Sequence, residues 1–316
     1  TTYSNAATGG AWSVSNTNAS VTSGGLVTPL AMGTATISYT VANSCGTATA
    51  TQPLTVGAFL SAGTITGPDN VCAGSFITLS DAISGGAWSS SNANATVSGG
   101  VVTGLSGGVA TISYTVTSSC GSASATQAVT VNPLPAAITG TTTLCEGATS
   151  TLSSGPSGGA WTTGSSSVAT INSSTGVATG VAAGTTTVTY TLSTGCFVTR
   201  AVSINPLPLP ISGLAQVCVN QTTILSDGTP GGTWTSSRVI VATVGSTTGI
   251  VAGVAAGTSI ITYSLLTNCN ATRVVTVTPA PAPIAGVSAI CVGTSTLYTD
   301  ATAGGVWSSS AAPIAT

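Results

Sequence analysis

The chain has 316 residues, of which 3% are charged, and it contains three arginines, no lysine and no histidine, with a net charge of −2. About a quarter of the residues in ordinary soluble domains are charged, and a surface this neutral offers nucleic acid or anionic lipid little electrostatic attraction. Because 42% of the residues are hydrophobic and valine and isoleucine recur regularly, we expect a folded chain. The longest weakly polar run, residues 249–257, falls short of the roughly 20 residues that span a membrane.

One short phrase recurs five times, beginning with Gly-Gly-Ala-Trp at residues 9–12. Its tryptophans follow one another at steps of 76, 73, 73 and 73 residues: Trp12, Trp88, Trp161, Trp234 and Trp307. A tyrosine recurs with the first four: Tyr39, Tyr114, Tyr190 and Tyr263. We predict that these aromatic residues form the structural core of each repeat, as one tryptophan per sandwich usually does. The alternative is a row of exposed tryptophans that stack against sugars.

The recurring phrase divides the chain into five predicted domains. They are residues 1–56, which lack the first strand, then 57–133, 134–206, 207–279, and the partial repeat 280–316. Proline-rich segments at 131–140, 204–213 and 277–286 end one repeat and open the next. Proline interrupts sheet pairing and favours an extended path, so we expect short, semi-rigid spacers. We expect the chain to be a segment of a longer array of such repeats.

Each repeat reads as a series of short strands, because apolar and small polar residues alternate and Gly, Asn or Ser stand between the runs. In the third repeat seven strands are predicted, within 136–147, 149–155, 158–164, 168–172, 176–181, 184–194 and 195–206. No stretch has helical periodicity. The predicted fold class is all-β without helices, a tandem array of small immunoglobulin-like (Ig-like) β-sandwiches of about 73 residues each.

Three segments make a family resemblance specific: WSSSNANATV at 88–97, GVATGVAAGTTTVTYT at 176–191 and GIVAGVAAGTSIITYS at 249–264. They resemble the bacterial immunoglobulin-like group 2 repeat, and the resemblance covers essentially the whole chain. It implies tandem modules of secreted or cell-surface proteins, mostly adhesins and stalks. The cysteine-bearing variant resembles arrays in large surface proteins of the Bacteroidota.

All eight cysteines keep their place in the repeat. One set precedes a tryptophan by 16 residues: Cys72, Cys145, Cys218 and Cys291. The other set follows the recurring tyrosine by 6 residues: Cys45, Cys120, Cys196 and Cys269. Two cysteines per repeat in a secreted type of chain predict disulfides rather than buried thiols. Zinc is not expected, because there is no histidine and no Cys-X-X-Cys.

Two disulfide pairings remain open. Pairing within a repeat would join Cys72 to Cys120, Cys145 to Cys196 and Cys218 to Cys269. In an Ig-like topology, however, these cysteines lie at opposite ends of the sandwich, roughly 20 Å apart, which exceeds the ~7 Å between Cα atoms that a disulfide tolerates. Pairing between successive repeats would instead join Cys72 to Cys196 and Cys145 to Cys269, leaving the other cysteines for partners elsewhere in the array.

The sequence offers few groups for catalysis, which commonly needs a general base, a nucleophile or a metal. We therefore predict no catalytic residue, no cofactor and no metal site. Asp81, Asp227 and Asp300 share one repeat position and are expected to accept turn hydrogen bonds, with weak calcium binding as the alternative. The three arginines are expected to be isolated surface charges: Arg200, Arg238 and Arg273.

These patterns predict a structural component of an extracellular filament or cell-surface stalk. The alternative is an adhesin region that binds carbohydrate or a host surface. The expected partners are neighbouring repeats and other copies of the chain, with no nucleic acid and no membrane span. Surface glycans are a further expectation, although chance accounts for most Asn-X-Ser/Thr matches in so Ser/Thr-rich a chain: Asn18, Asn94, Asn172, Asn220 and Asn270.

Overall fold

The protein is all-β. The computed structural model describes residues 1–316 apart from 59, 119, 303 and 311–316, and its described residues form strands, turns and bends but no helix. Strand burial follows the period of two expected of a sheet with one face in the core. In the segment 108–118, Ala110, Ile112 and Tyr114 are buried while the intervening Thr111 is exposed. The predicted fold class is confirmed.

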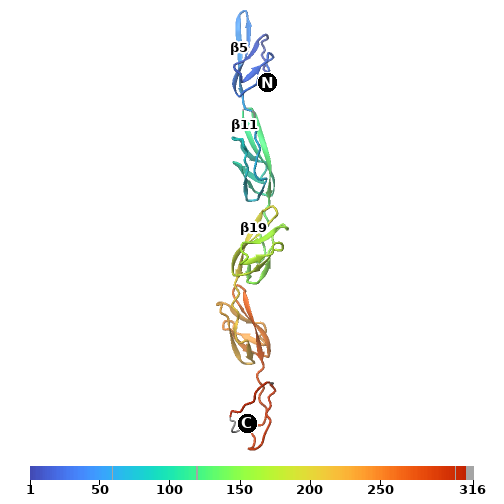
Figure 1. The fold of residues 1–316 in the computed structure, drawn as a ribbon, viewed down its shortest axis with the longest axis vertical. Coiled ribbons are helices and arrows are strands. Elements are labelled where there is room, and N and C mark those ends of the chain that lie inside the picture. Colours follow the sequence, from blue (N-terminus) through green and yellow to red (C-terminus); the bar gives the residue numbers. More distant parts are fainter. Residues whose placement is uncertain (59, 119, 303, 311–316) are drawn as a thin grey trace. The chain divides into compact units, whose positions relative to one another are not determined.

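The first repeat is the smallest of the sandwiches (Figure 1, blue). A three-stranded sheet in the order β1-β4-β5 faces the hairpin β2-β3. The strands are β1 (Ala11–Val14), β2 (Ala19–Val21), β3 (Val27–Pro29), β4 (Gly33–Asn43) and β5 (Gly46–Val56). Its fully buried core holds Ala19, Val27 and Ile37, with Leu54 only partly buried beside them.

The second repeat has the full two-sheet sandwich. Four strands pair in the order β6-β12-β11-β8 and three in the order β7-β10-β9. The strands are β6 (Asn70–Cys72), β7 (Phe76–Thr78), β8 (Ala87–Ser90), β9 (Ala95–Ser98), β10 (Val101–Gly104), β11 (Gly108–Ser118) and β12 (Gly121–Asn132). The short β6 runs parallel to the end of β12 and places Cys72 opposite Asn132. This added strand helps to bury Val129, the counterpart of the half-buried Leu54.

The third and fourth repeats keep the same arrangement. The third has sheets β13-β19-β18-β15 and β14-β17-β16, and the fourth has β21-β27-β26-β23 and β20-β22-β25-β24. The third-repeat strands are β13 (Thr143–Cys145), β14 (Thr149–Thr151), β15 (Ala160–Thr163), β16 (Ala169–Ile171), β17 (Val177–Gly180), β18 (Gly184–Thr191) and β19 (Phe197–Asn205). The fourth-repeat strands are β20 (Ser212–Gly213), β21 (Gln216–Cys218), β22 (Thr222–Ser226), β23 (Thr233–Ser236), β24 (Ala242–Val244), β25 (Ile250–Gly253), β26 (Gly257–Ser264) and β27 (Asn270–Thr278). All seven strands predicted for the third repeat are present.

In these four repeats the tryptophan packs against the tyrosine of the neighbouring strand. The ring centroids of the Trp88–Tyr114 pair are 4.8 Å apart, and those of the other three pairs are 4.7 Å apart. Trp161 and Trp234 are buried, whereas Trp12 and Trp88 are partly buried. The tyrosines are buried in all four: Tyr39, Tyr114, Tyr190 and Tyr263.

The fifth predicted repeat differs. Its described residues within 280–310 form no strand, only an isolated bridge between Ala285 and Thr299, and its residues 303 and 311–316 lie outside the described part. Trp307 is 57% exposed, so the prediction that it is a core residue is wrong for this structure. The physical reason is that the segment has no counterpart of the tyrosine strand on which the other tryptophans pack.

By its contacts the chain divides into two compact units, residues 1–136 with 191–198, and residues 137–190 with 199–316. The hairpin tip 191–198 therefore belongs with the first unit, although it lies in the sequence of the third repeat. The five domain boundaries proposed from the sequence stay a prediction.

Candidate functional site: the disulfide joints

Two disulfides each join the first strand of one repeat to a hairpin of the next. They are Cys72–Cys196 and Cys145–Cys269, each with 5.6 Å between Cα atoms and a sequence separation of 124 residues. Both Cα separations lie in the middle of the range that disulfides adopt. The structure thus has the pairing between successive repeats, and none of the three bonds of the within-repeat alternative.

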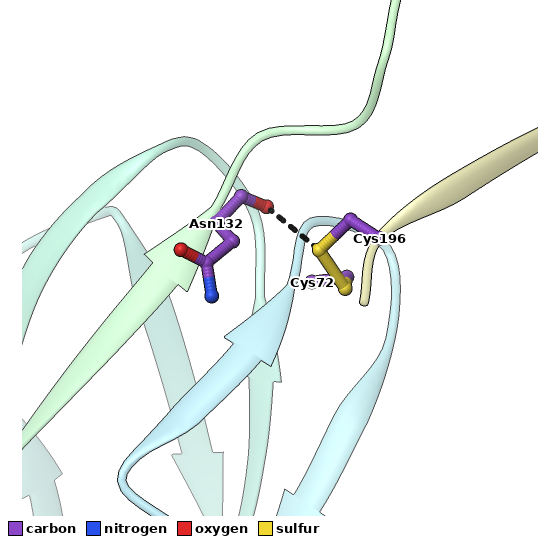
Figure 2. The surroundings of a disulfide bond; sticks show 3 residues. All are labelled: Cys72, Asn132 and Cys196. Carbon is purple, nitrogen blue, oxygen red and sulfur yellow. Dashed lines mark hydrogen bonds between the residues drawn. A yellow bond between two sulfur atoms is a disulfide. The ribbon is translucent and has the colours of Figure 1, made fainter. Parts of the chain in front are cut away.

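The first joint lies where β6 ends. Cys72 is the last residue of this strand and stands opposite Asn132, the last residue of β12. Cys196 comes from the turn just before β19, is 1% exposed, and its Sγ lies 3.9 Å from the carbonyl oxygen of Asn132 (Figure 2). A disulfide sulfur carries no hydrogen, so we regard the contact between Sγ and this carbonyl oxygen as van der Waals packing. It holds the hairpin against the end of the strand.

The second joint repeats the first. Cys145 ends β13 opposite Asn205, the last residue of β19. Cys269 is 1% exposed, and its Sγ lies 4.0 Å from the carbonyl oxygen of Asn205. The recurrence of partner, burial and distance shows that the joint is a defined feature of the repeat.

The two bonded hairpins share a backbone device. Gly195 and Asn268, the residues directly before the hairpin cysteines, have positive φ angles of 83° and 64°. Glycine and asparagine tolerate this left-handed conformation better than other residues. In each hairpin the amide N–H of Leu192 or Leu265 donates to the cysteine carbonyl at 2.9 Å and closes the turn.

The hairpins of the first two repeats have a different shape. Their strands β4, β5 and β11 have 11 residues and β12 has 12, whereas β18 and β26 have 8. The longer strands continue to a tight turn that holds Cys45 or Cys120. Both of these cysteines are exposed free thiols, as are Cys218 and Cys291.

Arg200 is exposed, as predicted, and Arg273 is half-buried, but neither is isolated. The guanidinium Nη1 of Arg200 donates to the carbonyl of Ile138, and that of Arg273 donates to the carbonyl of Ile211. In the second repeat Gln127 takes this position and donates through Nε2 to the carbonyls of Gly67 and Pro68, at 3.3 and 3.2 Å. These side chains fix the segment that leads into the first strand, and therefore the position of the joint cysteine.

The recurring aspartates lie in turns. Oδ1 of Asp81, Asp227 and Asp300 accepts a hydrogen bond from the amide two residues later, at 2.9, 2.8 and 2.5 Å. Oδ2 of Asp81 and of Asp227 is buried without a hydrogen-bond partner. The part of the chain that the structure describes has no cluster of three or more Cys, Asp or Glu side chains that could hold a metal ion.

The tryptophans of the third and fourth repeats border equivalent surface hollows of about 480 and 310 Å³. Trp161 and Trp234 contribute little to these hollows, since they are only 5% and 6% exposed. A sugar-stacking platform needs an open aromatic face, which neither indole ring offers.

Sequence reasoning missed three features of the joint: the asparagine that ends the last strand, the left-handed residue before the hairpin cysteine, and the arginine bond to the backbone. Two of them leave a signal in the sequence. The asparagine recurs at one repeat position, before the proline-rich linker, as Asn132 and Asn205. Cys196 and Cys269 follow Gly and Asn, whereas Cys45 and Cys120 follow Ser. The arginine contact leaves none, because it depends on the packing of the last strand against the first.

No family model matches the chain, and no curated protein matches it. Among solved structures it is similar to surface layer protein SbsC, domains 1–6, with 17% identity over 91% of this chain and 54% of that one, and a TM-score of 0.23. It is also similar to the C-terminal 282-residue fragment of intimin in complex with the intimin-binding domain of the translocated intimin receptor, with 17% identity over 56% and 60% of the chains and a TM-score of 0.26. A third is the N-terminal eight Ig domains of Down syndrome cell adhesion molecule, with 14% identity over 93% and 52% and a TM-score of 0.24.

The chain spans about half the length of the surface layer structures that it matches. Among its described residues, no helix is long and apolar enough to cross a membrane.

Proposed function

We propose that the protein is a structural component of an extracellular filament or cell-surface stalk, built from Ig-like modules that disulfides staple one to the next. The observation that carries this proposal is the repeated joint. Two disulfides with the same sequence separation and the same strand-end setting connect consecutive repeats. A domain that needed a disulfide only for its own stability would close the bond within itself.

The joint gives adjacent repeats two covalent connections. One is the peptide linker, such as the proline-rich segment after Asn132, and the other is the disulfide from Cys72 to Cys196. A single linker still lets neighbouring modules reorient about it, whereas a second connection restricts that freedom. An elongated support needs this restriction, because its length depends on successive modules keeping a fixed direction.

We further propose that the modules belong to the bacterial immunoglobulin-like group 2, in arrays of the kind found in the Bacteroidota. The support is the sequence resemblance in register over the whole chain. An extracellular location agrees with the disulfides, which persist in oxidising compartments. The low charge suits a surface that packs against other copies of the chain, since charge normally keeps proteins apart.

The chain is proposed to be non-catalytic, with no cofactor, because it lacks histidine and lysine. The alternative of a carbohydrate-binding adhesin has less support, since the third and fourth repeats bury Trp161 and Trp234. A glycan array probed with the oxidised chain tests it directly. Specific sugar binding would favour the adhesin over the structural role.

Electron microscopy of the full chain tests the proposed role of the joints. We expect the double variant Cys72→Ser, Cys145→Ser to show a wider spread of angles between successive modules than the oxidised parent. The matched control Cys45→Ser, Cys120→Ser removes two free thiols and should leave the spread unchanged. Equal spreads in the parent and the joint variant would contradict the proposal.

A further inference from the structure

We infer that the end of the fourth repeat around Cys218 is a docking and crosslinking site for a hairpin. The hairpin belongs to the next Ig-like module, which follows the linker 279–283 and carries its cysteines at the same repeat positions. This inference rests on the proposed structural role and adds a site and the kind of partner that fills it. Cys218 occupies the same strand-end position as Cys72 and Cys145.

Cys218 has the same surroundings as the two bonded strand-end cysteines. It ends β21 and pairs in parallel with Thr278 at the end of β27, as Cys72 pairs with Asn132 and Cys145 with Asn205. The residue before each of these cysteines is a buried aliphatic: Val71, Leu144 and Val217, at 5%, 7% and 6% exposure.

The backbone beneath these cysteines is also the same. A Cβ added to Gly104, Gly180 or Gly253 would meet the carbonyl oxygen of the strand-end cysteine at 3.0, 2.7 or 2.5 Å. Each cysteine is therefore held against a glycine of the opposite sheet, and its side chain starts from an equivalent backbone position. The backbone therefore positions Cys218 as it positions Cys72 and Cys145, although Cys218 has no bonded partner.

What distinguishes the Cys218 end is that it is uncovered. Cys218 is an exposed free thiol, and the hydroxyl of Thr278 donates to its Sγ at 3.6 Å. The linker proline nearby follows the same pattern, because Pro135 and Pro208 are buried whereas their counterpart Pro281 is exposed. At the two completed joints the strand-end cysteine is half-buried and the proline is buried, whereas both are exposed here, so this end lacks an occupant that the other two have.

The completed joints define that occupant. Both filled sites hold a hairpin whose cysteine follows a left-handed Gly or Asn and packs against the carbonyl of the residue opposite the strand-end cysteine. The hairpins of Cys45 and Cys120 have a tighter turn, so we expect the Cys218 end to prefer the wider hairpin found in the third and fourth repeats.

The crosslinking step is a thiol–disulfide exchange with a named oxidant. The Cys218 thiol and the hairpin thiol lose two protons and two electrons as the S–S bond forms. Glutathione disulfide accepts them and leaves as two molecules of glutathione.

The test extends the full chain. Thr316 aligns with Thr243 in the repeat, so a copy of residues 244–279 added after Thr316 completes a fifth module with a copy of Cys269 in its hairpin. After oxidation with glutathione disulfide, non-reducing peptide mapping is expected to find Cys218 bonded to the copied cysteine. Alkylation of Cys218 by iodoacetamide should fall by about tenfold or more relative to the unextended chain, because the bonded sulfur is no longer a thiol.

Three arms make the outcome decisive. The same extension with serine in place of the copied cysteine is the control, and Cys218 should stay fully reactive in it. A second extension with a copy of residues 171–206, which carries a copy of Cys196, covers the case in which the first fails to fold. Cys218 that stays free in both extensions, or that bonds to Cys291 or to a second molecule, would overturn the inference.

The same peptide maps separate this inference from the proposed function. If Cys72–Cys196 and Cys145–Cys269 are found while Cys218 stays free, only the docking site is wrong. If those two bonds are missing as well, the proposed stapling of the repeats is wrong.

Discussion

At the scale of single residues, the recurring Gly-Gly-X-Trp phrase is explained by the tyrosine beside the tryptophan. The hydroxyl of Tyr114 accepts a hydrogen bond from the amide of Gly86 at 2.8 Å and donates one to the carbonyl of Ile83 at 2.7 Å. Gly85 has a φ of 85°, and a Cβ on Gly86 would lie 2.5 Å from the Tyr114 ring. The first glycine therefore makes the turn, and the second leaves room for the tyrosine.

Replacing the second glycine should loosen its repeat. In Gly10→Ala the new Cβ would lie 2.4 Å from the ring of Tyr39, and overpacking of this kind costs about 1–3 kcal/mol. Hydrogen exchange followed by mass spectrometry should show faster exchange in peptides from β1 and β4. Gly24→Ala is the matched control, since its Cβ would meet nothing closer than 3.9 Å. Equal exchange in the two variants would refute the explanation.

The arginine bond to the backbone predicts a second residue effect. Arg273→Leu removes the donor to the carbonyl of Ile211, and because Arg273 is only half-buried and water competes for its guanidinium, we expect a loss of about 0.5–1.5 kcal/mol. Amides of β20 and β21 should exchange faster. Arg273→Gln should restore part of the protection, because Gln127, at the same position of the second repeat, also donates to the backbone before the first strand, at Gly67 and Pro68. A glutamine variant as unprotected as the leucine variant would count against this role.

The aromatic part of the core was in part predictable from the sequence, although Trp12 and Trp88 are only partly buried. Trp161, Trp234 and their tyrosines lie where the repeat placed them. The exposure of Trp307 was not predictable from its motif, because a core residue also needs neighbouring strands to pack on. The arginine contacts were hidden for a related reason, since their acceptors are backbone carbonyls that no residue type marks.

At the scale of strands and hairpins, the sequence indicated the strands through their alternation and left the disulfide pairing open. Strand length and topology argued that the two cysteines of one repeat are far apart and named Cys72–Cys196 and Cys145–Cys269 as the pairing between successive repeats, but they did not decide between this pairing and the one within a repeat. The choice depends on the widened turn at Gly195 and Asn268, which brings the hairpin cysteine to the strand end of the preceding repeat.

The pairing predicts which cysteines react under native conditions. Iodoacetamide should label the exposed thiols at once: Cys45, Cys120, Cys218 and Cys291. The four disulfide cysteines should be labelled only after unfolding with reductant, because Cys196 and Cys269 are 1% exposed and exchange requires access to the sulfur. Mass spectrometry of the labelled peptides reads out both sets. Native labelling at Cys72 or Cys145 would show that the joints are not closed.

At the scale of the whole molecule, the two disulfide loops overlap, because Cys145 lies inside the first loop and Cys196 inside the second. The shortest covalent route from Cys72 to Cys269 passes through both disulfides and along 145–196, a stretch of 51 residues instead of 197. At ~3.4 Å per residue the oxidised chain should extend about 500 Å less than the reduced chain. Single-molecule stretching with and without reductant measures this difference, and equal lengths would rule out the overlap.

The overlap also affects how the chain responds to a protease. A single cut anywhere between Cys72 and Cys269 leaves the two sides joined, since at least one disulfide bridges every peptide bond in that interval. After limited proteolysis restricted to one cut in this interval, a denaturing gel should show the intact mass without reductant and two fragments with it. Cutting the double variant Cys72→Ser, Cys145→Ser should release fragments in both lanes. An array extended by the same joint would keep its continuity through any isolated nick in its interior, a useful property for a structure exposed to secreted proteases.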